Sequence, residues 1–292
     1  MIEAFADSWG LFADTYLAGW AVAVLLSLVG VWVVARDQIF LGAAVSQAST
    51  LGTAVAIWLQ GVTVIHAFES DAVTFLFAVG ASFLTALVSA RPARSGRESA
   101  EAITGWIFLV GSTIPVLLLV RNPHGLEEVH RILFSSILGA SRADVWLFGG
   151  LLLISLVAVA RLRDRIVLYA MDPEMAGAVG MRLPLWRVGM AAWLGVAVGL
   201  SIHSAGMIYT FGCLVLPAMA ARKLCREVRP MFVVAPVLGL TTTVLAFVFA
   251  HTLDLPPAQL AVAFQCGVLV LAWGWSWIRQ GSWRANRFSE SG

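Results

Sequence analysis

The feature that most constrains this chain is a series of nine apolar segments, each long enough to cross a lipid bilayer as a helix. A spanning helix needs about 20 apolar residues, because the hydrocarbon core is about 30 Å thick and a helix rises about 1.5 Å per residue. Short polar breaks separate the segments. They are predicted at residues 16–35, 39–60, 71–90, 102–120, 144–162, 185–203, 205–222, 231–251 and 257–278.

Composition and periodicity agree with this pattern. The chain is 60% apolar and only 12% charged, whereas soluble domains carry about 25% charged residues. This balance excludes an ordinary soluble enzyme and a nucleic-acid binder. No period-2 alternation runs through the segments, which argues against a membrane β-barrel. We therefore predict an all-α, polytopic integral membrane protein with about eight to nine transmembrane helices in one domain, residues 1–292.

The basic residues predict the orientation. With nine spans, sixteen of the nineteen Lys and Arg residues fall on one side of the membrane, and such residues are retained in the cytoplasm. The sixteen are Arg36, Arg91, Arg94, Arg97, Arg161, Arg163, Arg165, Arg182, Arg187, Arg222, Lys223, Arg226, Arg229, Arg279, Arg284 and Arg287. The N-terminus is thus expected outside the cell and the C-terminus in the cytoplasm.

Ionisable residues are nearly absent inside the segments. Asp71 and Glu101 lie at segment ends, and no carboxylate lies mid-membrane, where proton- or sodium-driven transporters usually bury one. The only lysine, Lys223, is not part of a GxxxxGK[ST] phosphate loop. If ATP drives this protein, a second polypeptide must bind it. No protease motif lies in the segments, so the chain is not expected to be an enzyme.

Histidines and cysteines give weaker signals. All five histidines (His66, His124, His130, His203 and His251) fall on the outer half in this topology, where imidazoles could guide a cation inward or simply be solvated. The three cysteines (Cys213, Cys225 and Cys266) form no CxxC pair, so they are predicted to be small apolar fillers.

Four stretches carry a family resemblance when they are taken in order. They are Leu41–Gly52 (LGAAVSQASTLG), Glu101–Phe108 (EAITGWIF), Leu133–Asp144, and Met171–Gly180 (MDPEMAGAVG) continued by Leu216–Arg222 (LPAMAAR). They resemble LGDALSHAALPG, DAAIGIIF, an LFG segment, FDPELARALG and LLVLPAATAR in the permease subunits of bacterial zinc/manganese ABC transporters. The resemblance covers nearly the whole chain. It implies a type II ABC importer-like permease fold.

The resemblance also implies partners and a cargo. Such permeases work as homodimers with an ABC ATPase subunit and an extracytoplasmic solute-binding protein, and they import Zn²⁺ or Mn²⁺. No covalently bound cofactor is implied. The cytoplasmic stretch 172–180 resembles the family's coupling helix, and Asp172, Pro173 and Glu174 have the sequence of a helix start. A bulky charge at Ala176 or Gly180 is expected to uncouple the ATPase; an incidental loop helix is the alternative.

The second segment departs from the family at two positions. Where the family has an aspartate and a histidine one turn apart, facing the pathway, this chain has Ala43 and Gln47. Another ligand set could replace them: His203 and Met207 are spaced i, i+4, with Cys213 further along the chain, and ordinary packing is the competing interpretation. The second possibility is a weakly binding polar lining of Ser46, Gln47, Ser49 and Thr50.

The third possibility is a cargo other than a transition metal.

Pro217 is expected to kink the seventh segment and to face the bundle interior. The kink either lies near the pathway or serves packing alone. The leading functional hypothesis is the membrane subunit of an ATP-driven metal importer. An importer of a metal chelate or another small solute, a secondary transporter, and a scaffold or sensor without transport remain alternatives.

Overall fold

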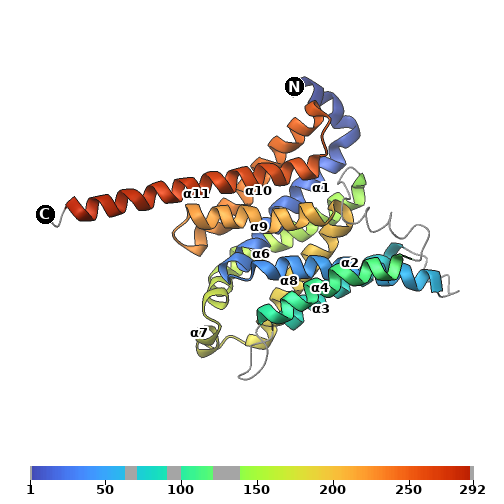
Figure 1. Ribbon diagram of the computed structural model, residues 1–292, viewed down its shortest axis with the longest axis horizontal. Helices are drawn as coiled ribbons and strands as arrows, with labels where there is room; N and C mark the ends of the chain where they lie inside the picture. Colours follow the sequence, from blue (N-terminus) through green and yellow to red (C-terminus); the bar gives the residue numbers. More distant parts are fainter. Residues whose placement is uncertain (1, 63–70, 91–99, 121–138, 290–292) are drawn as a thin grey trace.

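The computed structural model describes residues 2–62, 71–90, 100–120 and 139–289, and in these ranges it contains helices and no strand (Figure 1). The helices are α1 (Ile2–Ala35), α2 (Ile39–Val62), α3 (Asp71–Ser89), α4 (Ala100–Leu119), α6 (Arg142–Met171), α7 (Pro173–Ala178), α8 (Leu183–Ala205), α9 (Met207–Leu224), α10 (Val228–Leu253) and α11 (Pro257–Ser289). Every one of them except α7 is long and apolar enough to cross a membrane, which makes nine candidate spans among the described residues. The predicted all-α, multi-pass fold class is confirmed.

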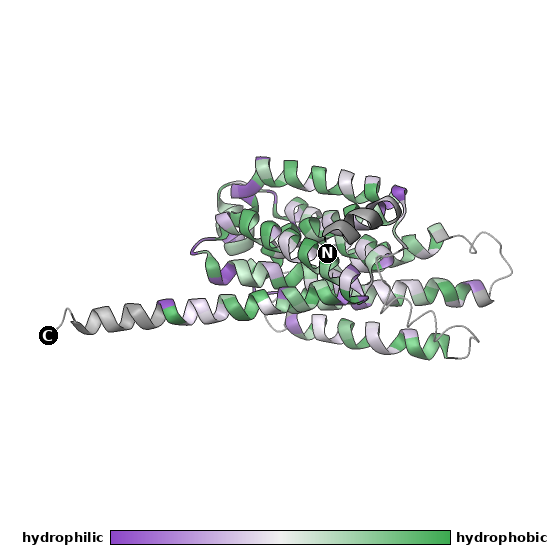
Figure 2. Ribbon diagram, turned by 90° about the horizontal axis from the view of Figure 1, so that it is seen from above, coloured by the Kyte–Doolittle hydropathy of each residue, from purple (hydrophilic) through white to green (hydrophobic). Residues whose placement is uncertain are grey.

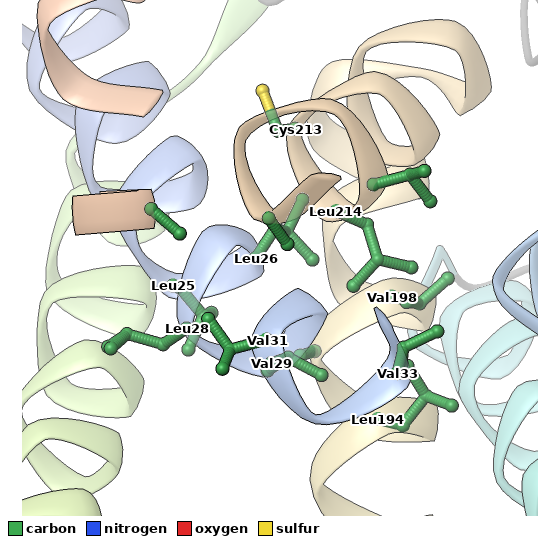
Figure 3. Packing of buried hydrophobic residues seen from close by; sticks show 14 of the residues in the cluster. Leu25, Leu26, Leu28, Val29, Val31, Val33, Leu194, Val198, Cys213 and Leu214 are labelled. Atoms are coloured by element: carbon green, nitrogen blue, oxygen red, sulfur yellow. The ribbon is translucent and has the colours of Figure 1, made fainter. Parts of the chain in front are cut away.

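Helix α1 lies in the middle of the bundle because it is apolar on all sides. It packs against α6, α9 and α10. Figure 3 shows Leu25, Leu26 and Leu28 within this contact, with Leu214 of α9 close by. Near the end of α1, Trp32 is only 2% exposed. The remaining spans are built around this helix.

Glycines allow the helices to approach closely, as is common where membrane helices pack. A Cβ added at Gly30 of α1 would lie 1.7 Å from the Leu214 carbonyl oxygen of α9, so no side chain fits there. A Cβ at Gly195 of α8 would lie 2.5 Å from the Phe83 Cα of α3. Backbone-to-backbone packing therefore fixes where α9 and α3 lie.

The other helices form two groups around α1. Helix α2 packs on α3 and α4, and α3 packs on α8. Helix α11 packs on α9 and α10, and its C-terminal part projects away from the bundle (Figure 1). Hydrophilic residues gather towards the helix ends in Figure 2, whereas the middle parts are largely hydrophobic. This distribution is the one that a bilayer requires of spanning helices.

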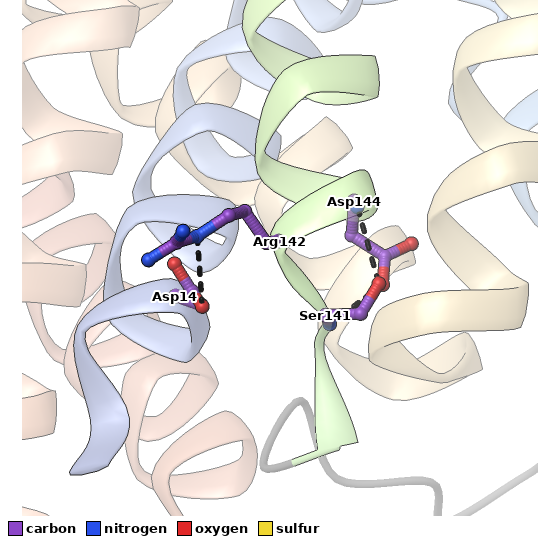
Figure 4. Close-up of polar contacts among 4 residues, drawn as sticks. All are labelled: Asp14, Ser141, Arg142 and Asp144. Carbon is purple, nitrogen blue, oxygen red and sulfur yellow. Dashed lines mark hydrogen bonds and ion pairs between the residues drawn. The ribbon is translucent and has the colours of Figure 1, made fainter.

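Polar contacts tie together helix ends that the topology places on the same side. At the start of α6, Arg142 Nε lies 4.0 Å from Asp14 Oδ2 of α1 (Figure 4). Ser141 caps the same helix in a reciprocal capping box with Asp144. At the opposite end, Arg229 Nε of α10 lies 3.3 Å from Asp164 Oδ1 of α6. Helix α6 therefore runs in the same direction as α1 and opposite to α10.

Three helices extend well beyond the predicted segments: α1 begins at Ile2 and not at 16, α11 ends at Ser289 and not at 278, and α6 is also longer. Helix α6 has 30 residues, about 45 Å at the usual rise, whereas the apolar segment predicted there ends at 162. Its last turns carry the exposed Arg161, Arg163 and Arg165, which do not stop a helix but do leave the bilayer. The junction after α8 is one residue long, as in the predicted segments, but it lies at Gly206, with a φ of 80°, and not at residue 204.

Candidate functional site

A cavity of about 390 Å³ lies between α2, α4, α9 and α11. From α2 it is lined by Ala43, Ser46 and Gln47. Ala43 and Gln47 are the two positions that depart from the family sequence, and Ser46 is one of the predicted pathway residues. Met207 of α9 lines it as well. The structure thus brings together two of the predicted pathway residues and one member of the predicted ligand pair.

Most of the remaining lining is apolar. Phe108 comes from α4, Phe211 and Leu216 come from α9, and Val262 comes from α11. The Phe108 ring is held by Phe40, whose centroid is 5.1 Å away. The polar atoms offered to a cargo are therefore few. They are the Ser46 hydroxyl and the Gln47 amide, together with the sulfur atoms of Met207 and Cys266.

The hydroxyls predicted to form a polar lining are mostly engaged within α2. Ser46 Oγ donates to the Gly42 carbonyl at 2.9 Å, and Thr50 Oγ1 donates to the Ser46 carbonyl at 3.3 Å. Ser49 is fully buried, and its hydroxyl has no hydrogen-bond partner in the described part of the chain. Ser49 and Thr50 do not line the cavity. Only Ser46 and Gln47 of this set face it.

His203 and Met207 are not on one helix face, contrary to what their i, i+4 spacing suggests. Gly206 ends α8 in a conformation that no continuous helix adopts, so His203 belongs to α8 and Met207 to α9. The His203 side chain is exposed, and its ring meets Phe75 edge-on at 5.6 Å. It does not line the cavity. A ligand role for His203 stays a prediction.

Pro217 lies inside α9 and is buried, one residue after the cavity-lining Leu216. Because proline has no N–H, the Cys213 carbonyl loses its helical partner. The Ser27 hydroxyl of α1 lies 3.3 Å from that carbonyl oxygen, and 2.6 Å from the Ala23 carbonyl oxygen. The break in hydrogen bonding is therefore covered by protein, as the membrane interior requires.

Helix α7 begins as the sequence predicts. Asp172 is its N-cap, and its Oδ1 accepts a hydrogen bond from the Met175 amide at 2.8 Å; Pro173 is the first helical residue. Ala176 faces inward and is fully buried, and Gly180 ends the segment with a φ of 86°. The outer face of α7 is exposed and carries both the acidic Glu174 and the apolar Met175, which is 52% exposed.

No group of three or more His, Cys, Asp or Glu side chains gathers in the described ranges. His66, His124 and His130 lie outside the described residues, and His251 is exposed at the end of α10. Close to the entry of α2, a charged contact joins Arg222 of α9 to Asp37. The Arg222 hydrogen bond holds the pKa of the Asp37 carboxyl below its ordinary value.

Most lining residues have no counterpart among the sequence candidates, and Phe108, Phe211 and Cys266 are three of them. Phe211 is spaced i+4 from Met207, so it belongs to the same face of α9. Phe108 and Cys266 come from α4 and α11, and only the packing of those helices brings them to α2. The sequence predicts an apolar filler at Cys266, whereas this side chain is exposed and faces the cavity.

Comparison with known proteins defines the class to which this fold belongs. The chain resembles the solved structure of PsaBC from Streptococcus pneumoniae in complex with Fab, with a TM-score of 0.73, 20% identity, and coverage of 93% of this chain and 95% of that one. A putative metal-chelate type ABC transporter in an inward-facing conformation gives a TM-score of 0.70 at 17% identity, over 93% and 89% of the two chains. The fold is that of a polytopic ABC transporter permease.

The family follows from the sequence match. Residues 9–275 match the model of the ABC 3 transport family, and the chain belongs to that family. The manganese transport system membrane protein MntC of Halalkalibacterium halodurans is 22% identical over 97% of this chain and 94% of its own length. The chelated iron transport system membrane protein YfeD of Yersinia pestis is 24% identical over 88% and 82%.

Proposed function

We propose that this chain is the membrane-spanning subunit of an ATP-driven importer that moves a divalent transition metal, Mn²⁺ or Zn²⁺, into a bacterial cytoplasm. The observation that carries the proposal is the cavity that Gln47 and Ser46 share with Met207. Its lining includes Ala43 and Gln47, the α2 positions that correspond by resemblance to the aspartate and histidine of zinc/manganese permeases. Relatives that share nearly the full length are described as manganese and chelated-iron transport proteins.

The donor set favours a cargo that is bound weakly and then released. An amide oxygen and a hydroxyl are weaker ligands than a carboxylate and an imidazole, and thioether and thiol groups favour softer ions. Weak binding is compatible with conduction because an ion must also leave its site. Delivery by an extracytoplasmic binding protein would compensate for the low affinity. Two copies of the chain around a central pathway would add a second set of the same groups.

ATP hydrolysis is assigned to a separate ABC ATPase subunit. Helix α7 supports this assignment, because exposed Met171, Met175 and Val179 lie on it or at its two ends, on the same side as the arginine-rich end of α6. Exposed apolar side chains outside the bilayer mark an interaction surface. Seated in a cleft of the ATPase, α7 would pass its motion to α6 and α8, which it contacts. The chain itself is not an enzyme and binds no resident cofactor.

The orientation is part of the proposal. The end of the bundle that carries Arg36, Arg222 and Arg229 is assigned to the cytoplasm because basic residues are retained there. The N-terminus is then extracytoplasmic and the C-terminus cytoplasmic, in the inner membrane.

A metal chelate is the second candidate cargo. The apolar part of the cavity lining, in particular Phe108, Ile208 and Phe211, favours it, because a bare dication gains nothing from such walls. A chelate would instead place its organic part against them.

Reconstitution tests the proposal. The chain would be placed in proteoliposomes with its ATPase and binding protein, and uptake of Mn²⁺, Zn²⁺ and their chelates would be followed with and without ATP. ATP-dependent uptake of the free ions supports the metal importer, and uptake of chelates alone supports the second candidate. Uptake that needs an ion gradient but no ATP would overturn both.

Two variants of α2 make the test specific. Replacing Gln47 by histidine restores a family ligand and should increase metal uptake at low concentration, whereas Gln47→Ala should reduce it. Gln60→Ala is the matched control. Gln60 is on the same helix, but it does not line the cavity, and its Nε2 donates a hydrogen bond of 3.1 Å to Thr74 Oγ1. Equal effects at both positions would contradict a pathway role for Gln47.

A further inference from the structure

An apolar groove of about 500 Å³ runs along the surface between α6 and α8, separate from the cavity described above. Leu151, Ile154, Ala158 and Leu162 line it on α6, and Trp193 forms part of the α8 wall. Ser155 also lines the groove, but its hydroxyl accepts the Trp193 Nε1 hydrogen bond at 2.9 Å. The Trp193 N–H and the Ser155 oxygen thus bond each other, and the largely apolar walls favour an apolar occupant.

A second cavity, of about 440 Å³, continues from one end of this groove. The two share Leu185 and Trp186, so they form one continuous surface depression. The second cavity is lined by Arg165 of α6 and Arg182 at the start of α8. Asp164 is also in the lining, but Arg229 pairs with it at 3.3 Å. The cavity therefore keeps an excess of positive charge.

The position of the two parts relative to the bilayer matches an amphiphile. The apolar groove lies along residues 151–162 of α6, inside the segment predicted to cross the hydrocarbon core. The arginines lie beyond it, in the part of α6 that continues past the bilayer and at the start of α8. Basic pockets between helices at the cytoplasmic boundary are where anionic lipid head groups bind. A soluble phosphate would use the arginines but leave the adjoining groove without an occupant.

We propose that this depression binds an anionic phospholipid, with an acyl chain in the groove between α6 and α8 and the phosphate held by Arg165 and Arg182. The head-group end also contacts Val179 and Gly180, which follow α7. A bound lipid would therefore support the turn that holds α7 against the bundle. This site concerns the surface of one chain and does not depend on which cargo the central cavity accepts.

Native mass spectrometry of the purified full-length chain tests the site. The detergent-solubilised protein would be exchanged into equal amounts of phosphatidylglycerol and phosphatidylcholine, and the retained lipids would be counted. The wild type should retain phosphatidylglycerol preferentially. Arg165→Gln with Arg182→Gln should lower that preference about tenfold. Arg226→Gln, an exposed arginine on the same side outside both cavities, should leave it unchanged.

A second variant tests the groove independently of charge. Gly189 lines it, and a Cβ added there meets no atom within 4 Å, so the backbone position accepts a side chain and Gly189→Trp is designed to fill the groove. It should reduce retention of both lipids. Gly274→Trp on α11, where an added Cβ likewise meets no atom within 4 Å, is the control and should not reduce retention.

Three results would overturn the proposal: equal retention of the two lipids by the wild type, unchanged preference in the double arginine variant, or dimer loss without lipid loss in Gly189→Trp. The last would show that a second copy of the chain covers the groove. If Gly189→Trp is not recovered as a monodisperse protein, the arginine variants at exposed positions decide the matter alone.

Discussion

The Ser27 hydroxyl of α1 lies 3.3 Å from the Cys213 carbonyl oxygen of α9, the carbonyl that Pro217 leaves without a helical N–H. Pro217 is thereby accommodated by a side chain from a neighbouring helix. The same hydroxyl also lies 2.6 Å from the Ala23 carbonyl oxygen. Since a hydroxyl has one hydrogen, it serves one carbonyl at a time.

Ser27→Ala should therefore lower the stability of the wild type by about 0.5–1 kcal/mol. In a Pro217→Ala background the loss should be smaller, because the alanine introduced there has the N–H that the Cys213 carbonyl lacks in the wild type. Thermal unfolding of the four proteins in detergent completes a double-mutant cycle. An equal loss in both backgrounds would mean that Ser27 acts only through Ala23. Ser276→Ala, whose hydroxyl bonds its own helix, is the control.

Gly111 of α4 should tolerate no larger residue. A Cβ there would lie 2.8 Å from the Gln47 carbonyl carbon, so Gly111→Ala must push α4 away from the part of α2 that lines the cavity. Overpacking of this kind costs about 1–3 kcal/mol. Both melting temperature and transport should fall. Gly105→Ala is the control on the same helix, because the atom nearest to its Cβ is 4.0 Å away, and it should change neither the melting temperature nor transport. If Gly105→Ala lowers them as well, the loss comes from the composition of α4 and not from the contact with Gln47.

The Asp37–Arg222 pair predicts a dependence of stability on pH. The folded state lowers the pKa of Asp37, so the pair stabilises the fold above about pH 4 and the effect is lost as the pH falls through the lowered pKa. Asp37→Asn should destabilise by less than about 1 kcal/mol at neutral pH, because both side chains are exposed. The difference from wild type should vanish in acid. A difference that persists in acid would show a role other than the charge.

Helix α7 gives a test of partner binding. Met175→Glu places a charge on the exposed face of α7, so it should abolish co-purification with the ATPase and leave the melting temperature unchanged. The positions suggested by the sequence, Ala176 and Gly180, are less suitable. Ala176 is fully buried, and a residue other than glycine at Gly180 is strained by its positive φ. Ala176→Glu is therefore expected to have a lower melting temperature. Retained ATPase binding by Met175→Glu would contradict the assignment of α7 as the ATPase-binding surface.

Much of the fold could be predicted because bilayer thickness and helical rise fix the length of a span. The helix start at Asp172 was also predictable, since capping depends on neighbouring residues only. The cavity was not. Ser46 and Gln47 share one helix, but Phe108 and Cys266 reach them only through the packing of α4 and α11, which no local pattern encodes. The spacing of His203 and Met207 misled for a different reason, because Gly206 interrupts the helix on which that spacing depends.

The single residue between α8 and α9 also limits how the bundle can move. Helix α8 begins shortly after α7, and Met207, a wall of the central cavity, directly follows Gly206. A loop of several residues would absorb a displacement of α8 as slack. With one glycine as the hinge, α9 must take up any shift of α8 along its axis. A displacement at the α7 end of α8 is therefore coupled to the cavity wall at Met207.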